Sequence, residues 1–240
     1  SRPGRRRLRP ARPLAAKPLR PAPSRPAFGA PSLTIPLQDP GLPDPALDVR
    51  KAAMRRDFRR LRRAAAAAGG ADAAAALAAE AGALATRLPR PPQHIAGYVA
   101  AGGEIDVLPL LVALGAATGA GLCLPVVTAP DTALDFRVWQ PDAPLVAGAF
   151  GILMPEEAAG RCLPDLLLMP LVAVDRAGRR LGQGGGFYDR TLAAADAAGR
   201  MPLTIGVCFA IQLADEVPAG PLDRPLDLIL TERGLLVPVR

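Results

Sequence analysis

The residues best suited to chemistry form one glycine-rich stretch, Arg179–Arg190. Its four glycines fill all but one of positions 182–186, between an apolar run at 165–175 and a helix expected over 191–198. A glycine turn before a helix brings backbone N–H groups and the positive helix end close to phosphate oxygens. Asp189 stands where it could hold a metal ion that bridges phosphates. The stretch predicts a nucleotide-phosphate site, with a purely structural tight turn as the alternative.

The stretch is not one of the two common phosphate-binding motifs. It lacks the Gly-Lys-Ser/Thr of a Walker A loop. Gly182, Gly184 and Gly186 also lack the spacing of a dinucleotide fingerprint, whose third glycine follows the second by three residues. The motif is therefore unusual, and by itself it does not define a mechanism.

Histidine and cysteine usage narrows the possible chemistry. His94 is the single histidine, so a Ser-His-Asp triad or a Cys-His pair would have to use it, and we expect it to be structural. Cys123, Cys162 and Cys208 are far apart and form no C-x-x-C motif, which argues against zinc and disulfides and fits a reducing, cytoplasmic location. Metal binding must then rest on carboxylates, which favours Mg²⁺.

Charge and proline are concentrated at the start of the chain. Residues 1–47 hold nine of the 29 Lys and Arg, two of the 22 Asp and Glu, and 12 of the 28 Pro. We predict a disordered tail over 1–46, which is a passive extension, a targeting segment or a basic binding segment, and one α/β domain over 47–240. The rest of the chain is neutral, and no run reaches the ~18 apolar residues of a membrane span.

The remaining chain alternates helical and apolar strand patterns. Helices are expected over 48–68, which Gly69-Gly70 would end, and over 72–88, 105–118 and 191–198. Strands are expected over 95–99, 122–127, 136–139, 166–174 (interrupted by Pro170), 204–209 and 228–231. Continuous apolar strands separated by helices predict a three-layer α/β/α fold with a mostly parallel central sheet. Ligands of such sheets gather at the carboxyl ends of the strands, where the glycine stretch falls.

Four segments together resemble the 5-formyltetrahydrofolate cyclo-ligase family, also called the 5,10-methenyltetrahydrofolate synthetase family. They occur in the expected order across residues 48–235. They are Lys51-x-x-x-Arg55, Gly103-Glu104-Ile105-Asp106, the stretch from Met169-Pro170 through Asp189, and Asp223-x-x-x-Asp227 running into Leu230-Thr231-Glu232. The third segment is highly specific, and the others gain weight from their order and spacing.

The resemblance implies an enzyme that uses Mg-ATP to cyclise 5-formyltetrahydrofolate and that is a monomer or a loose assembly. In the family the formyl oxygen is phosphorylated, N10 attacks the activated carbon, and phosphate leaves. The products are 5,10-methenyltetrahydrofolate, ADP and phosphate. Phosphoryl transfer of this kind needs positioning and charge neutralisation more than a protein nucleophile, so the lack of a usable histidine is no obstacle.

The resemblance also implies site residues, although it assigns no catalytic group. ATP would be bound by Lys51 and Arg55, one helical turn apart, and by Arg180, Leu181, Gly182, Gln183, Gly184, Gly185, Gly186, Phe187 and Tyr188. Magnesium would be held by Asp189 and Asp223, with Asp227 as a substitute for Asp223. The reduced folate would contact Glu104, Val99 and Tyr188, because pterin N–H groups suit a bidentate carboxylate. Phe187 and Trp139 would line the folate pocket or belong to the core.

Three positions depart from the family pattern. Family loops often carry Lys or Arg between the glycines, where this chain has Gln183 and Gly185. The charge that faces ATP would then come from the first helix or from Arg179, Arg180 and Arg190. Met154 stands where the family often has Glu before the proline of its Gly-Ile-x-x-Pro segment.

Two other classes of function stay open at this point. One is a phosphosugar isomerase or deaminase with Asp189 or Glu104 as base, which would need neither ATP nor magnesium. The other is a nucleic-acid-binding protein that acts through its basic tail and would lose binding when residues 1–46 are removed. For the ligase, we expect Asp189→Ala or Lys51→Ala to lose turnover without unfolding the protein.

Overall fold

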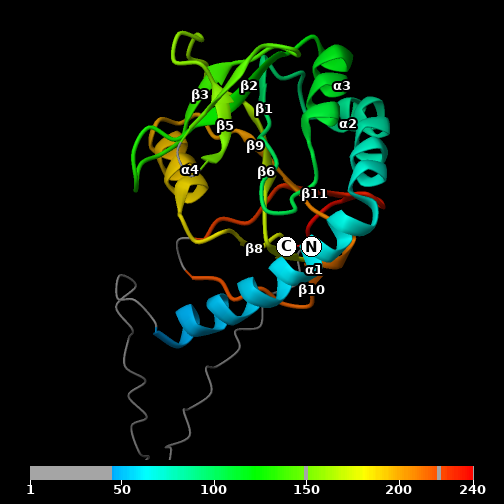
Figure 1. The fold of residues 1–240 in the computed structure, drawn as a ribbon, viewed down its shortest axis with the longest axis vertical. Helices are drawn as coiled ribbons and strands as arrows, with labels where there is room; N and C mark the ends of the chain where they lie inside the picture. Colours follow the sequence, from blue (N-terminus) through cyan, green and yellow to red (C-terminus); the bar gives the residue numbers. More distant parts are fainter. Residues whose placement is uncertain (1–44, 149–150, 221–222, 240) are drawn as a thin grey trace, which may run out of the picture. The chain divides into compact units, whose positions relative to one another are not determined.

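The computed structural model describes residues 45–148, 151–220 and 223–239, so the predicted tail lies outside the described residues except for Pro45 and Ala46. A seven-stranded sheet forms the middle layer (Figure 1), in the order β12-β11-β9-β6-β1-β2-β3. Its strands are β1 (His94–Ala96), β2 (Gly121–Val126), β3 (Asp135–Val138), β6 (Leu166–Pro170), β9 (Leu203–Val207), β11 (Leu228–Thr231) and β12 (Gly234–Leu236). Neighbours from β11 to β2 are parallel, and β12 and β3 are antiparallel edges. The predicted mostly parallel sheet is confirmed.

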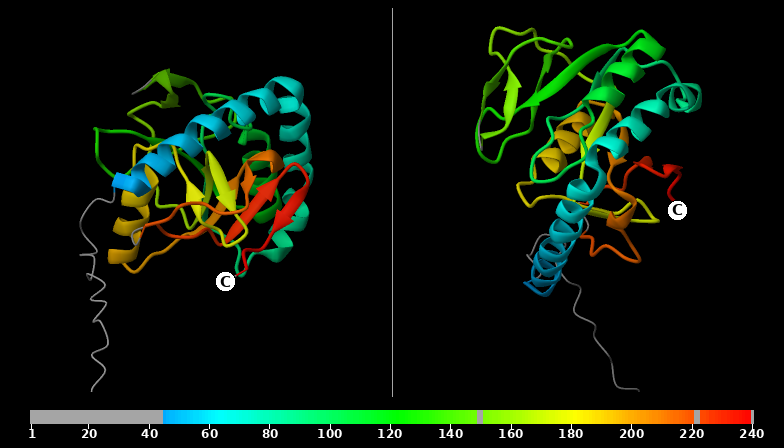
Figure 2. Two further views of the ribbon diagram at one scale, coloured as in Figure 1. Left: turned by 90° about the horizontal axis from the view of Figure 1, so that it is seen from below. Right: turned by 45° about the vertical axis from the view of Figure 1, so that its right-hand side comes forward.

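Helices cover both faces of the sheet, as Figure 2 shows. The helices are α1 (Pro45–Ala79), α2 (Ala81–Arg87), α3 (Leu108–Thr118), α4 (Phe187–Ala197) and the 3₁₀ turn η2 (Ala210–Gln212). Alternate strand residues enter two separate cores, because successive side chains of a strand point to opposite faces. Ile95 packs in the core that contains Leu77 and Leu110 of the first three helices, whereas Ala96 packs in the core that contains Leu192 of α4. The predicted three-layer architecture is therefore confirmed.

The first helix differs from the prediction at Gly69-Gly70. α1 runs through both glycines to Ala79 as two helical segments that meet at a kink, where Gly69 has a non-helical φ of −171° and ψ of 37°. The glycines therefore mark a kink within α1 rather than its end. The actual break comes at Glu80, ahead of α2. Before the kink, α1 presents its cationic residues to the carboxyl ends of the strands.

Pro170 separates two strands that belong to different sheets. After β6 the chain leaves the large sheet and enters β7 (Ala173–Asp175), which pairs with β8 (Arg180–Leu181) and β10 (Leu213–Ala214) in a three-stranded sheet. The glycine loop follows β8 directly and leads into α4, which begins four residues before the predicted Thr191. Gly184 and Gly186 have φ of 105° and 66°, conformations that other residues rarely adopt. The loop thus needs glycine at these positions.

Five short strands were not predicted from the sequence: β4 (Leu145–Ala147), β5 (Leu153–Pro155), β8, β10 and β12. They are two or three residues long, which is too short to show alternation of polar and apolar residues. β4 and β5 form an antiparallel pair of their own. Within the described residues, no helix is long and apolar enough to cross a membrane.

Candidate functional site

One cavity of about 890 Å³ brings the predicted site residues together at the carboxyl ends of β1, β2 and β6. In the sheet, β1 lies between β2 and β6. Most of the residues predicted to contact ATP, folate or magnesium line this cavity: Lys51, Arg55, Val99, Glu104, residues 180–188, Asp189 and Asp223. The sheet therefore places this cavity where open α/β folds bind ligands.

The loop half of the cavity consists of Lys51, Arg55, Arg180, Asp189, Asp223 and glycine-loop residues 182–186. Arg55 Nε donates to the carbonyl of Gly182 at 3.0 Å, so α1 is tied directly to the loop. One helical turn earlier, Lys51 Nζ lies 2.6 Å from Asp223 Oδ2. That same oxygen accepts a hydrogen bond from the backbone N–H of Gly220 at 2.7 Å. The predicted common face of Lys51 and Arg55 is confirmed.

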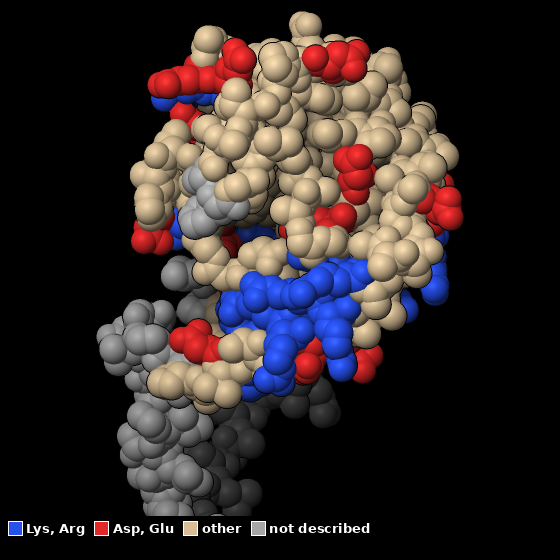
Figure 3. Space-filling view, viewed as in Figure 1, with Lys and Arg blue, Asp and Glu red and all other residues tan. Residues whose placement is uncertain are grey.

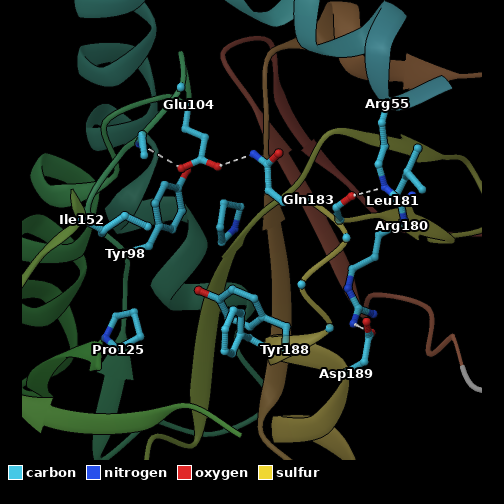
Figure 4. Close-up of a pocket in the computed structure, with 18 of the residues that line it drawn as sticks. Arg55, Tyr98, Glu104, Pro125, Ile152, Arg180, Leu181, Gln183, Tyr188 and Asp189 are labelled. Atoms are coloured by element: carbon cyan, nitrogen blue, oxygen red, sulfur yellow. Dashed lines mark hydrogen bonds and ion pairs between the residues drawn. The ribbon is translucent and has the colours of Figure 1, made fainter. Parts of the chain in front are cut away.

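Arg180 and Asp189 form an ion pair across the start of α4 (Figure 4). The Arg180 side chain is buried and also donates to the carbonyl of Arg224, whereas the Asp189 side chain is 49% exposed. The predicted ATP-binding and metal-binding residues thus neutralise each other in pairs, Arg180 with Asp189 and Lys51 with Asp223. The glycine loop connects Arg180 in β8 to Asp189 in the first turn of α4.

The Glu104 half of the cavity is built on a buried ion pair. Arg62 Nη1 lies 3.2 Å from Glu104 Oε1, and the two side chains are only 2% and 9% exposed. Burial lowers the pKa of Arg62, and the carboxylate of Glu104 opposes that effect. The other carboxylate oxygen accepts the backbone N–H of Ala101 at 3.0 Å. The sequence analysis named Glu104 but did not name Arg62. Arg62 lies on the same helix as Lys51 and Arg55, and steps of three or four residues along that helix lead from them to Arg62.

Gln183 joins the two halves of the cavity. Its amide nitrogen donates to Glu104 Oε1 at 3.1 Å, so the middle of the glycine loop reaches the buried carboxylate (Figure 4). Arg59 holds Gln183 from the other side, through Nε to the amide oxygen at 3.0 Å and through Nη2 to the backbone carbonyl at 2.7 Å. Family loops often carry a cation at the position of Gln183. In this chain the cation beside that position is Arg59 of α1.

An apolar wall closes the Glu104 half opposite the ion pair. It consists of side chains from the ends of β1 and β2, from β5 and from α4: Tyr98, Val99, Pro125, Ile152, Met154 and Tyr188. Tyr98 donates its hydroxyl to the carbonyl of Ile105 at 3.0 Å, and burial raises the pKa of both tyrosines. Met154, which departs from the family pattern, is thus part of this wall.

Several candidates named from the sequence lie outside the cavity. Trp139 belongs to the core under the first three helices, so it does not line the cavity. Arg179 pairs with the buried Asp175, and Arg190 donates to the carbonyls of Gly185 and Thr132. Asp227 accepts hydrogen bonds from Thr204, which ties β9 to β11. Asp223, not Asp227, is therefore the acid at the cavity.

The carboxylates at the cavity are sparse. Across the described ranges, no three His, Cys, Asp or Glu side chains gather closely enough to hold a metal ion by themselves. Besides Glu104, the acids that line the cavity are Asp48, Asp189 and Asp223. Such a donor set suits a cation that takes most of its remaining ligands from phosphate and water, as Mg²⁺ does.

Comparison with known proteins assigns the family. The model of the 5-formyltetrahydrofolate cyclo-ligase family matches residues 48–232. The curated 5-formyltetrahydrofolate cyclo-ligase of Mycolicibacterium smegmatis is 36% identical over 163 residues, which cover 61% of this chain and 77% of the relative. The Escherichia coli K12 enzyme of the same name is 36% identical over 143 residues, covering 57% and 76%.

A solved structure agrees with this assignment. The solution structure of 5,10-methenyltetrahydrofolate synthetase from Aquifex aeolicus superposes with a TM-score of 0.61 at 26% identity, covering 79% of this chain and 93% of that one. The Mycoplasma pneumoniae synthetase shares the fold, with a TM-score of 0.58 at 23% identity. These matches leave the phosphosugar isomerase alternative without support. The chain therefore belongs to the 5-formyltetrahydrofolate cyclo-ligase family of enzymes.

Proposed function

We propose that this enzyme cyclises 5-formyltetrahydrofolate to 5,10-methenyltetrahydrofolate with Mg-ATP, releasing ADP and phosphate. The observation that supports this most is the division of one cavity into two chemically different halves. The loop half offers cations and backbone N–H groups for phosphates. The Glu104 half offers one carboxylate and an apolar wall for a pterin ring. A reaction that transfers a phosphoryl group from a nucleotide to a reduced folate needs both substrates in one place.

In the loop half, phosphate oxygens would replace the partners that Lys51 and Arg55 have now. Lys51 would exchange Asp223 for phosphate, and Arg55 would exchange the carbonyl of Gly182. Arg180 is buried and firmly paired, so its role is to hold Asp189 and the start of α4 rather than to contact phosphate directly. This changes the assignment made for Arg180 from the sequence.

In the Glu104 half, the pterin ring would lie against the apolar wall and donate its N–H groups to Glu104. Arg62 holds this carboxylate in place, because the two side chains form a buried ion pair at 3.2 Å. The wall excludes water from the activated intermediate, which would otherwise hydrolyse. Val99 and Tyr188 take part in this wall as predicted contacts.

The reaction then proceeds by two displacements. The formyl oxygen bonds to the γ-phosphorus as the bond to ADP breaks, and the cations of the loop half stabilise the charge that develops on the phosphoryl oxygens. N10 next attacks the formyl carbon and loses its proton, and the carbon–oxygen bond breaks to release phosphate. Position and electrostatics carry both steps, and neither requires a covalent bond to the protein.

Asp189 and Asp223 are suitable residues to hold Mg²⁺ together with the phosphates of ATP. Both are oxygen donors in the loop half, and both are partly exposed, 49% and 23%. When bound, Mg²⁺ would neutralise phosphate charge and polarise the transferred group. The pairing of each acid with a cation of the chain keeps the two carboxylates compensated when no nucleotide is present.

The test of the proposal is product formation. Purified protein is mixed with 5-formyltetrahydrofolate, ATP and Mg²⁺, and the near-ultraviolet absorbance of the methenyl product is followed. A rise that requires both ATP and Mg²⁺ supports the proposal. No rise from folded protein that binds both substrates would overturn it.

A further inference from the structure

Gln183 occupies a place on Glu104 that a bound pterin would need. A carboxylate has about four acceptor positions, two on each oxygen. Glu104 Oε1 already accepts from Arg62 Nη1 and from Gln183 Nε2, at 3.2 Å and 3.1 Å. Oε2 accepts from the backbone of Ala101 at 3.0 Å. One position is left, whereas bidentate contact with two pterin N–H groups takes two.

The three donors to Glu104 differ in how easily they leave. Arg62 is buried and also bonded to the carbonyls of Gly102 and Leu171, and the N–H of Ala101 belongs to the fixed turn before Glu104. Gln183 is exposed and stands in a glycine loop between Gly182 and Gly184, where the backbone rotates at little steric cost. Gln183 is therefore the donor that an incoming ring displaces.

We propose that Gln183 is a latch, released from Glu104 when folate binds, which couples folate binding to the ATP loop. The inference rests on the proposed function, because it takes the ligand of Glu104 to be the pterin. Release leaves Gln183 held by Arg59 alone and returns a free amide donor to the loop that faces the phosphates. Conversely, phosphates that draw the glycine loop toward α1 break the hydrogen bond between Gln183 and Glu104.

The latch predicts that the two substrates bind cooperatively. Each ligand removes the same contact, so the second ligand no longer has to break it. Coupling of this kind is reciprocal, so ATP must strengthen folate binding by the factor by which folate strengthens ATP binding. A Gln183 that merely orients Glu104 would produce no such coupling through this residue.

The experiment measures binding of 5-formyltetrahydrofolate by calorimetry, with and without the non-hydrolysable β,γ-imido analogue of ATP and Mg²⁺. The variant is Gln183→Met, which keeps the length of the side chain and removes the donor. Gln140→Met is the matched control, because Gln140 is an exposed glutamine outside the cavity. Melting curves of all three proteins verify that they are folded.

In the wild type, the analogue should tighten folate binding about fivefold or more, within the usual range of coupling between sites. In Gln183→Met, folate alone should bind up to about tenfold tighter, the factor for one hydrogen bond to a charged group, and the coupling factor should fall toward one. Gln140→Met should behave as the wild type does.

Two results would overturn the latch. One is a Gln183→Met variant that binds folate no tighter than the wild type; the other is undiminished coupling in that variant. Formation of the methenyl product by the wild type separates this failure from a failure of the proposed function. If the wild type neither binds folate nor forms product, both proposals are wrong.

Discussion

The two halves of the cavity hold their charges in different ways. In the loop half, the carboxylates of Asp189 and Asp223 are 49% and 23% exposed. In the Glu104 half, Arg62 and Glu104 are 2% and 9% exposed. A partly exposed pair costs little to open, since water replaces the lost partner, whereas a buried pair cannot be opened without leaving a charge unsolvated. The carboxylates of the loop half can therefore exchange their partners, whereas the ion pair of the Glu104 half stays intact.

The surface around α1 extends this contrast. Lys and Arg side chains gather over α1 on the face seen in Figure 3. Arg56, Arg60 and Arg63 are exposed and surround a small groove, and of these three only Arg63 also lines the main cavity. α1 therefore carries exposed arginines, cations that can exchange partners and a buried arginine on successive parts of its circumference. The extent of burial decides which of these side chains has a structural role.

Removal of the metal should have the largest effect and act on the loop half alone. Chelation by EDTA should reduce turnover by about a thousandfold or more, because a metal ion contributes several kcal/mol of charge stabilisation. Folate binding to the Glu104 half, measured by calorimetry in the absence of nucleotide, should not change. Turnover that survives chelation would remove the functional distinction between the halves.

Breaking the buried pair should have the next largest effect, this time on the fold. Arg62→Met should lower the free energy of unfolding by about 3–5 kcal/mol, the usual cost of stranding one buried charge, as measured in urea. The double variant Arg62→Met/Glu104→Gln should recover much of this loss, because the stranded carboxylate becomes a neutral amide. A loss below about 1 kcal/mol in Arg62→Met would mean that this pair is as exchangeable as a surface pair.

Lys51→Ala should reduce turnover about 100- to 1000-fold, the range for one preorganised charge-stabilising group. The melting temperature should change little, since Lys51 forms a partly exposed pair. Arg60→Ala is the control: it removes an exposed cation of the same helix that does not line the main cavity. Equal loss of turnover in the two variants would indicate that only the overall charge of α1 matters.

The smallest effect should appear in alkaline solution. Burial raises the pKa of Tyr98 and Tyr188, so the folded protein keeps protons that the unfolded chain loses above its tyrosine pKa of about 10. Stability is therefore unaffected by these groups below about pH 10 and falls above it, by up to about 1.4 kcal/mol per pH unit for each tyrosine.

Tyr98→Phe tests this directly, with urea unfolding measured between about pH 9 and 11. Loss of the hydrogen bond to Ile105 should lower stability equally at every pH, whereas loss of the titrating group should make the alkaline slope shallower. An unchanged slope would mean that Tyr98 titrates normally and that the Glu104 half is open to water.

The local motifs of this chain were enough to predict the chemical classes at the site. The glycines between β8 and α4 could be named from type and spacing, whereas the cations one turn apart on α1 and Glu104 after β1 were named through the resemblance to the family. Apolar runs separated by helices predicted the parallel sheet, and the carboxyl-end rule then predicted where ligands bind. These features depend on neighbours within a few residues.

Other features depended on contacts between distant segments. The placement of β7 in a second sheet and the short strands β4 and β5 follow from packing that no local pattern encodes. Trp139 has the residue type of a ligand contact, yet its surroundings place it in the core. Burial, not residue type, also distinguished Arg62 from the other arginines of α1.

The partners of the charged groups were decided by tertiary structure alone. The family resemblance implied a cation and an acid near phosphates, but it did not reveal that Lys51 pairs with Asp223, 172 positions away. Nor did it reveal that Gln183 reaches Glu104, 79 positions away. Residue identity sets which interactions a side chain can form. Which one it forms, and at what energetic cost, depends on the groups and the water that the fold leaves beside it.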